Sequence, residues 1–374
     1  MEPSSRLEQQ IKYLHKELEF IKQQNKRILS HLQSNQNATE HLKQLNLKLI
    51  SFLAKNKSVR IKHVNPLITV QNLHNNQISA ILELGSTRIA TGSKDGVLAV
   101  SEVNYSTKQW NIVSKLNNAH SSKIWTICEL PNNRLVSGSF DKLIKIWHLQ
   151  SRSKLVLAHV FKEHSGGIDK VISLTNNRIA SCSYDDHTVK VWNSEPPYNT
   201  VNISFDQLIF PNSIIQLNCQ HEVICISGLY RDGGNMYFYE LNKPYQRKGV
   251  VEKVWTNLNN GLVELRNGDI AVSKGDETPC IYIINGLQYV KVAEIFDDSC
   301  IIDYGALCSW GNRSFIYACK NAFCQIDLQG GEYKIVYKQI EQEDVFGWCS
   351  LVKVNGGKHI IVKRLNGFNV FEVN

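Results

Sequence analysis

The sequence lacks every linear motif that identifies a common catalytic site. It contains no Gly-x-x-x-x-Gly-Lys phosphate loop, no Gly-x-Gly-x-x-Gly dinucleotide loop, no His-Glu-x-x-His zinc motif and no Gly-x-Ser-x-Gly nucleophile turn. His221-Glu222 has no second histidine at helical spacing, and the acidic pair Asp297-Asp298 falls in a predicted loop. We therefore expect a protein that is not an enzyme and has no cofactor and no metal site.

The sequence also lacks any apolar run near the roughly 18–20 residues of a membrane span, and residues 1–20 are charged throughout, without the apolar core of a signal peptide. Its ten cysteines include no Cys-x-x-Cys pair, which argues against a zinc ribbon and for reduced thiols. Hydrophobic residues make up 43% of the 374, enough for a sizeable core. We expect a folded cytoplasmic protein, and cytoskeletal or ciliary association stays open.

The net charge of +8 is concentrated in an N-terminal arm, residues 1–63, which holds 12 Lys and Arg against five Asp and Glu. The remaining 311 residues hold 30 against 29. Any attraction to nucleic acid, anionic lipid or acidic protein tails is therefore expected from the arm. Its cations are spread singly and not in a block, which favours an ordinary solvated helix face.

A heptad pattern runs through the first half of the arm and predicts an α-helical coiled coil. An asparagine at one core position favours two strands in fixed register, although the Leu and Ile choices do not decide the oligomeric state. The alternative is a helix that packs along its own large domain. The pattern lapses over residues 34–39, where we expect a break. The core positions are Leu7, Ile11, Leu14, Leu18, Ile21, Asn25, Ile28 and Leu32.

Seven repeats of about 45 residues follow the arm. In the first three, a histidine precedes a predicted strand, a second strand ends in Ser or Thr and small residues, a turn carries Asp, and a third strand follows. Downstream the signature residues fade, but short β runs keep the period, which is typical of four-stranded propeller blades. The second strands are predicted to begin near Arg88, Arg134, Arg178, Glu222, Asp269, Arg313 and Lys358.

These residues resemble the WD-repeat family of β-propellers over about residues 64–374. The WD dipeptide itself is absent, because Trp147 is followed by His148 and Trp192 by Asn193. The resemblance implies an all-β fold, a seven-bladed β-propeller of WD-repeat type (64–374), preceded by the coiled-coil arm (1–63). That order is similar to the G-protein β subunit and to coiled-coil propeller scaffolds.

The last predicted blade has three strands, and residues 64–73 have no other partner. We expect this segment to pair with the last blade, to cover its exposed edge and to close the ring.

The resemblance also implies a buried hydrogen-bonded set in each early blade, formed by His, Ser or Thr, the turn Asp and the third-strand Trp. Blade 1 has Ser101 where the Trp would lie. In blade 3 the extra residue in Tyr184-Asp185-Asp186-His187 leaves open which Asp pairs with His164, and we assign Asp185. The set, to which we assign a structural role, comprises His74, Thr91, Asp95, His120, Ser137, Asp141, Trp147, His164, Ser181, Asp185 and Trp192.

One face of WD-repeat propellers gathers side chains from the starts of first strands and from the turns before the Asp. Blade 2 stands out, because Ile124 and Ile127 take the buried side of their strand and leave Trp125 pointing away, while Phe140 lies in a turn. The alternative is that Trp125 fills space against a neighbouring blade. The predicted partner-binding residues are Gln77, Ser79, Lys94, Lys123, Trp125, Phe140, Asp169 and Tyr184, with Gly167 beside them.

The leading functional prediction is a non-enzymatic scaffold whose propeller binds partner proteins and whose arm dimerises or pairs with a partner helix. Alternatives are a G-protein β-like signalling subunit, a substrate receptor of a ubiquitin ligase, and a microtubule or nucleic-acid binder that acts through the basic arm. The first would need a small partner helix, and no RING-like or F-box-like segment supports the second. The third predicts affinity that falls steeply with salt.

Overall fold

The computed structural model divides the chain into two compact units, residues 1–57 and 58–374, and describes most of the second. The predicted coiled coil falls outside the described residues. These are residues 64–85, 87–150, 154–203, 205, 209–218, 223–230, 233–242, 245–254, 261–273, 280–286, 288–296, 306–310, 314–318, 322–329, 332–340, 351–354, 358–363 and 368–373.

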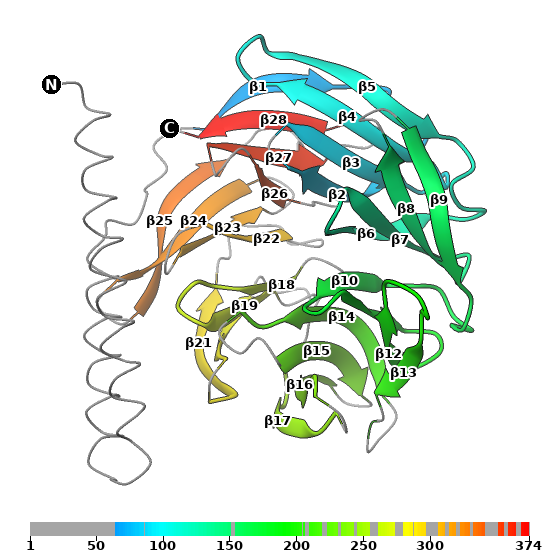
Figure 1. Cartoon of the computed structure of the whole chain (residues 1–374). Helices are drawn as coiled ribbons and strands as arrows, with labels where there is room; N and C mark the ends of the chain where they lie inside the picture. The colour runs from blue at the N-terminus through cyan, green and yellow to red at the C-terminus, as the bar shows by residue number, and fades with distance from the viewer. Residues whose placement is uncertain are drawn as a thin grey trace, which may run out of the picture. The chain divides into compact units, whose positions relative to one another are not determined.

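The described residues form seven four-stranded antiparallel sheets arranged as the blades of a propeller (Figure 1). The prediction of a seven-bladed all-β propeller is confirmed. Blades 1–3, which carry the clearest repeats, are β2 (Ile78–Leu84), β3 (Arg88–Ser93), β4 (Leu98–Asn104) and β5 (Gln109–Leu116); β6 (Ile124–Leu130), β7 (Arg134–Ser139), β8 (Ile144–Gln150) and β9 (Lys154–Phe161); and β10 (Lys170–Leu174), β11 (Arg178–Ser183), β12 (Thr188–Asn193) and β13 (Thr200–Ile203).

The other four blades keep this architecture although their signature residues have faded. Their second strands begin within one residue of the predicted positions. The strands are β14 (Phe210–Gln216), β15 (Val223–Tyr230), β16 (Gly233–Glu240) and β17 (Arg247–Val251); β18 (Leu262–Glu264), β19 (Asp269–Ser273), β20 (Cys280–Asn285) and β21 (Val290–Phe296); β22 (Ala306–Ser309), β23 (Ser314–Ala318), β24 (Ala322–Gln329) and β25 (Glu332–Ile340); and β26 (Leu351–Val354), β27 (His359–Lys363), β28 (Phe368–Val373) and β1 (Val64–Val70).

Burial falls from the middle of each blade to its outer strand. The second strands β3, β7 and β11 are buried along all but their first residue, because neighbouring blades cover both of their faces. Glycine permits this close stacking: a Cβ on Gly138 would lie 2.6 Å from the Ile168 side chain, and one on Gly92 would lie 2.5 Å from that of Ile124. The outer strand β5 is mostly exposed or half-buried.

The ring closes between the two ends of the described chain. Strand β1 pairs antiparallel with β28, so the last blade takes its outer strand from the N-terminal side of blade 1 (Figure 1). Ile68, Val70 and Leu73 are buried in one apolar cluster with Ile89 of blade 1 and Phe368 of the last blade. The closing segment therefore joins the first and last blades through both backbone hydrogen bonds and side-chain packing.

Among the described residues, no helix is long and apolar enough to cross a membrane. Five of the cysteines described there are not in disulfides: Cys128, Cys182, Cys225, Cys308 and Cys324.

Candidate partner-binding face

In blades 1–3, the turn before each first strand lies beside the turn after the second strand of the same blade. Lys94 N donates to Gln77 O (2.9 Å), and Phe140 N donates to Lys123 O (3.0 Å). In blade 3 a side chain makes the link, because Tyr184 N donates to Asp169 Oδ2 (2.6 Å). We call the end of blades 1–3 formed by residues 74–79, 94–97, 120–125, 140–143, 164–169 and 184–187 the upper face.

Blade 2 contains the complete buried set expected from the sequence. His120 lies with Nε2 2.7 Å from Ser137 Oγ and Nδ1 2.8 Å from Asp141 Oδ2. Trp147 Nε1 donates to the same Ser137 Oγ (2.7 Å). Asp141 also accepts from the backbone amides of Ser121 and Leu143, both at 3.1 Å.

The donors and acceptors of this set admit one assignment of protons. The Asp141 carboxylate only accepts, so His120 Nδ1 carries the proton and Nε2 accepts from the Ser137 hydroxyl, which itself accepts from Trp147. Burial lowers the pKa of His120 despite the opposing effect of Asp141, which keeps the ring neutral. Every member of the set is satisfied, so it needs no substrate to explain it.

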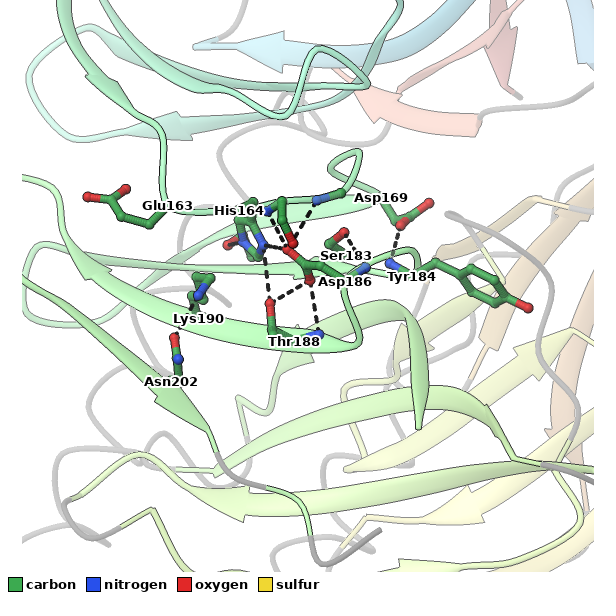
Figure 2. A network of polar contacts seen from close by, with 12 residues as sticks. Glu163, His164, Asp169, Ser183, Tyr184, Asp186, Thr188, Lys190 and Asn202 are labelled. Carbon is green, nitrogen blue, oxygen red and sulfur yellow. Dashed lines mark hydrogen bonds and ion pairs between the residues drawn. The ribbon is translucent and has the colours of Figure 1, made fainter. Parts of the chain in front are cut away.

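Blade 3 has the same arrangement but uses Asp186, which corrects the assignment of Asp185 (Figure 2). His164 Nδ1 lies 2.7 Å from Asp186 Oδ2 and its Nε2 lies 2.7 Å from Ser181 Oγ, which accepts from Trp192 Nε1 at 2.8 Å. Asp185 is exposed. The turn is one residue longer than in blade 2, so the second aspartate reaches the histidine.

Hydrogen bonds hold Asp186 in its charged form. Its Oδ1 accepts from Thr188 Oγ1 (2.6 Å) and Thr188 N (3.1 Å) (Figure 2). Burial alone would raise the pKa of Asp186, but the hydrogen bonds from His164 and Thr188 outweigh burial and hold the pKa well below its usual range. The aspartate is therefore a fixed structural anion.

Blade 1 holds a looser version of the set. His74 Nε2 lies 2.8 Å from Thr91 Oγ1, but His74 Nδ1 is 3.9 Å from Asp95 Oδ1. Burial lowers the pKa of His74 to about 4. Ser101 replaces the Trp, and its buried hydroxyl has no hydrogen-bond partner among the described residues. The described residues also contain no group of three or more His, Cys, Asp or Glu arranged to hold a metal.

A basic aromatic cluster lies on the upper face of blade 2. The rings of Trp125 and Phe140 meet edge to face with centroids 5.3 Å apart, and Lys123 Nζ lies 3.8 Å from the Phe140 centroid and 5.1 Å from that of Trp125. Phe140 also packs on Gly167 of blade 3, where a Cβ would lie 3.1 Å from the ring.

Neither ring is fully exposed, although the sequence pattern predicts that Trp125 points away from the sheet core. Both side chains are half-buried. The strand bulges between Ile124 and Thr126, so simple alternation does not apply at Trp125. The indole Nε1 is buried and has no hydrogen-bond partner among the described residues. An unpaired buried donor is costly, so the described residues leave this ring incompletely satisfied.

The predicted residues of blade 1 have different surroundings. Gln77 is buried, and Ser79 donates to the Ile124 carbonyl of blade 2, so both serve the packing of the blades more than the surface. Lys94 is half-buried, and burial together with the nearby Lys123 lowers its pKa. Of the three residues predicted in blade 1, Lys94 is thus the one that adds charge to the cluster.

On the other side of the cluster, blade 3 adds aromatic and acidic groups. The Tyr184 ring lies 5.0 Å from Phe210 of blade 4, and Phe210 meets His187 at 4.3 Å. Asp169 is only 6% exposed, so it is not placed to contact a partner directly. It contributes its charge to this face and holds the backbone amide of Tyr184. Sequence reasoning missed Phe210, because it comes from a blade without signature residues.

Asp169 makes the stability of the propeller depend on pH. Burial raises the pKa of Asp169 to about 7; Asp185 and Asp186 add to the rise, while the Tyr184 amide and Lys123 oppose it. The pKa of the same carboxyl in the unfolded chain is near 4, so folding favours its protonated form. This contribution to stability is fully present below about pH 4 and is lost as pH rises through about 7, where the buried carboxyl ionises.

We expect Asp169→Asn, which cannot ionise but can still accept from the Tyr184 amide, to raise the melting temperature at pH 8 more than at pH 5. Thermal denaturation of both chains across this range measures the difference. An equal difference at both pH values would contradict the assignment.

Comparisons with known proteins agree with this geometry. The family model described as "WD domain, G-beta repeat" matches residues 110–148 and 155–193, which span most of blades 2 and 3. The structure is similar to the crystal structure of the WD40 beta propeller domain of Doa1, with a TM-score of 0.64 and 14% identity over 83% of this chain and 97% of that chain. No curated protein sequence matches the chain.

Proposed function

We propose that this chain, a seven-bladed β-propeller with WD40 repeats, is a non-enzymatic scaffold that binds a partner protein on the upper face of blades 1–3. Propellers of this kind are generally protein-interaction scaffolds, and their fold is typically non-catalytic. In blades 2 and 3 the hydrogen bonds of the buried His, Ser and Asp sets are made within the blades, which supports a structural role for these sets. A cytoplasmic location fits the cysteines that are not in disulfides and belongs to the same proposal.

The observation that carries the proposal is the cluster of Lys123, Trp125 and Phe140. Two half-buried aromatic rings share one cation, and one ring holds an unpaired indole donor. Large aromatic side chains beside a charge are the residues that dominate interface energies. A partner that covers the two rings would bury the apolar surface that they leave half-exposed.

The double change Trp125→Ala and Phe140→Ala tests this surface. We expect partner capture to fall by at least tenfold, because truncation of an interface anchor costs about 2 kcal/mol or more. The control is Leu157→Ala, which removes a side chain that is 46% exposed on the outer strand of the same blade. Quantitative affinity capture, with melting temperatures of all three chains, measures the effect. Capture that survives the double change would contradict the proposal.

We also propose that residues 1–63 form a coiled coil that dimerises or pairs with a partner helix, on the support of the heptad pattern alone. We expect light scattering at micromolar concentration to give a dimer for the full chain and a monomer for residues 64–374. A monomeric full chain would rule out the homodimer and leave a heterologous partner helix.

A further inference from the structure

We propose that the upper face of blades 1 and 2 binds an acidic peptide segment with at least one large apolar side chain. This inference rests on the proposed scaffold function and specifies the chemistry of the partner. The residues concerned are Lys94, Lys123, Trp125 and Phe140, which we call the basic aromatic patch.

The two aspartates beside the patch, Asp95 and Asp141, already accept hydrogen bonds from donors in their own blades. Asp141 accepts from His120 and from two backbone amides, and its side chain is only 5% exposed. Asp95 accepts from the amides of Asn75 and Val97, both at 3.1 Å. These carboxylates cap turns, and their lone pairs are directed at donors within their own blades. The charge that remains for a partner on these two blades is therefore largely basic.

The lysines of the patch repel one another. Lys123 lies against the faces of two rings, and its charge helps to lower the pKa of Lys94. Lys142, in the turn after Phe140, is exposed and adds a third cation to the same end of these blades. A carboxylate placed among these cations would relieve their repulsion. Electrostatic complementarity thus selects an acidic ligand.

The rings define the second requirement of the ligand. Trp125 and Phe140 meet edge to face and are half-buried, so they offer one apolar contact site beside the lysines. A leucine or aromatic side chain could cover them. A purely acidic peptide without an apolar residue would leave this apolar contact site uncovered.

Blade 3 limits how far the acidic part of the ligand extends. Asp185 is exposed on its upper face, and the buried Asp169 adds negative charge there when it is ionised. An acidic residue above them would be repelled, so the ligand is expected to change from acidic over blades 1 and 2 to neutral or basic over blade 3. The positive charge of Lys123 lowers the pKa of Asp169, and ionisation of Asp169 would weaken the attraction for an acidic ligand.

Selection from a random twelve-residue peptide library displayed on phage, against the full chain, tests the proposal. We expect enriched peptides to carry net negative charge and a leucine or aromatic residue. Their affinity should fall roughly tenfold or more with Lys123→Glu and with Lys94→Glu. For the wild type, the affinity should be higher in low salt than in high salt, because salt screens the attraction between the lysines and the acidic peptide. The matched control is Lys154→Glu, which makes the same charge change at the first residue of β9, in the hairpin that follows β8 at the other end of blade 2.

The outcomes separate this inference from the proposed function. Acidic peptides that lose binding with both lysine changes, and keep it with Lys154→Glu, support the inference. Peptides that bind the Trp125→Ala and Phe140→Ala chain normally overturn both the inference and the proposed face. Peptides that need the two rings but are neutral or basic overturn the acidic preference and leave the face intact. A library without any binder overturns the inference.

Discussion

Removing residues 1–73 is expected to unfold or aggregate the propeller, whereas removing residues 1–63 leaves it folded. The longer deletion takes away β1 and exposes the edge of β28. It also removes the buried side chains of Ile68, Val70 and Leu73. At about 1.5–3 kcal/mol each, their loss amounts to roughly 5–9 kcal/mol, comparable with the whole stability of a typical domain.

Circular dichroism melting and size-exclusion chromatography of the two truncated chains measure this effect. A finer pair of variants uses neighbours on opposite faces of the same strand. Ile68→Ala should cost about 2–5 kcal/mol, whereas Thr69→Ala, at an exposed position, should stay within about 0.5 kcal/mol. A melting temperature unchanged by removal of residues 64–73 would show that β1 does not close the ring.

The second large effect is expected at two adjacent aspartates. Asp186→Ala should destabilise the protein by about 3–5 kcal/mol, because it leaves His164 Nδ1 and the amides of Ser165 and Thr188 without their acceptor. Asp185→Ala removes an exposed carboxylate and should change stability by no more than about 0.5 kcal/mol. Urea denaturation of both variants measures the contrast, and equal costs would contradict the geometry of blade 3.

The low pKa of Asp186 adds a pH signature to this contrast. Its folded pKa lies below the unfolded value, so its contribution to stability is present above about pH 4 and is lost as pH falls. The destabilisation caused by Asp186→Ala should therefore shrink in acid.

The repeat period was predictable because it depends on local sequence, whereas the buried sets were implied by the resemblance to WD-repeat propellers. The structure joins His120, Ser137 and Trp147 in one such set. The resemblance did not choose between Asp185 and Asp186, because the number of residues in the turn sets which side chain reaches His164. His187, in that turn, adopts a left-handed φ of 58° that its sequence alone does not reveal.

The candidate face was less predictable than the blades. Strict alternation places Trp125 outside, but the bulge between Ile124 and Thr126 lets its ring lie half-buried against Phe140. The contact of Phe140 with Gly167 and that of Tyr184 with Phe210 join neighbouring blades. Such contacts depend on how the blades stack, and no local sequence pattern encodes that.

Hydrogen–deuterium exchange of the full chain, with and without a saturating selected peptide, tests the central claim most directly. If the upper face binds the partner, the amides of residues 94–97, 120–125 and 140–143 gain protection, while the opposite hairpin turn at residues 105–108 exchanges as before. Protection confined to residues 105–108, or to the outer strands, would contradict the account.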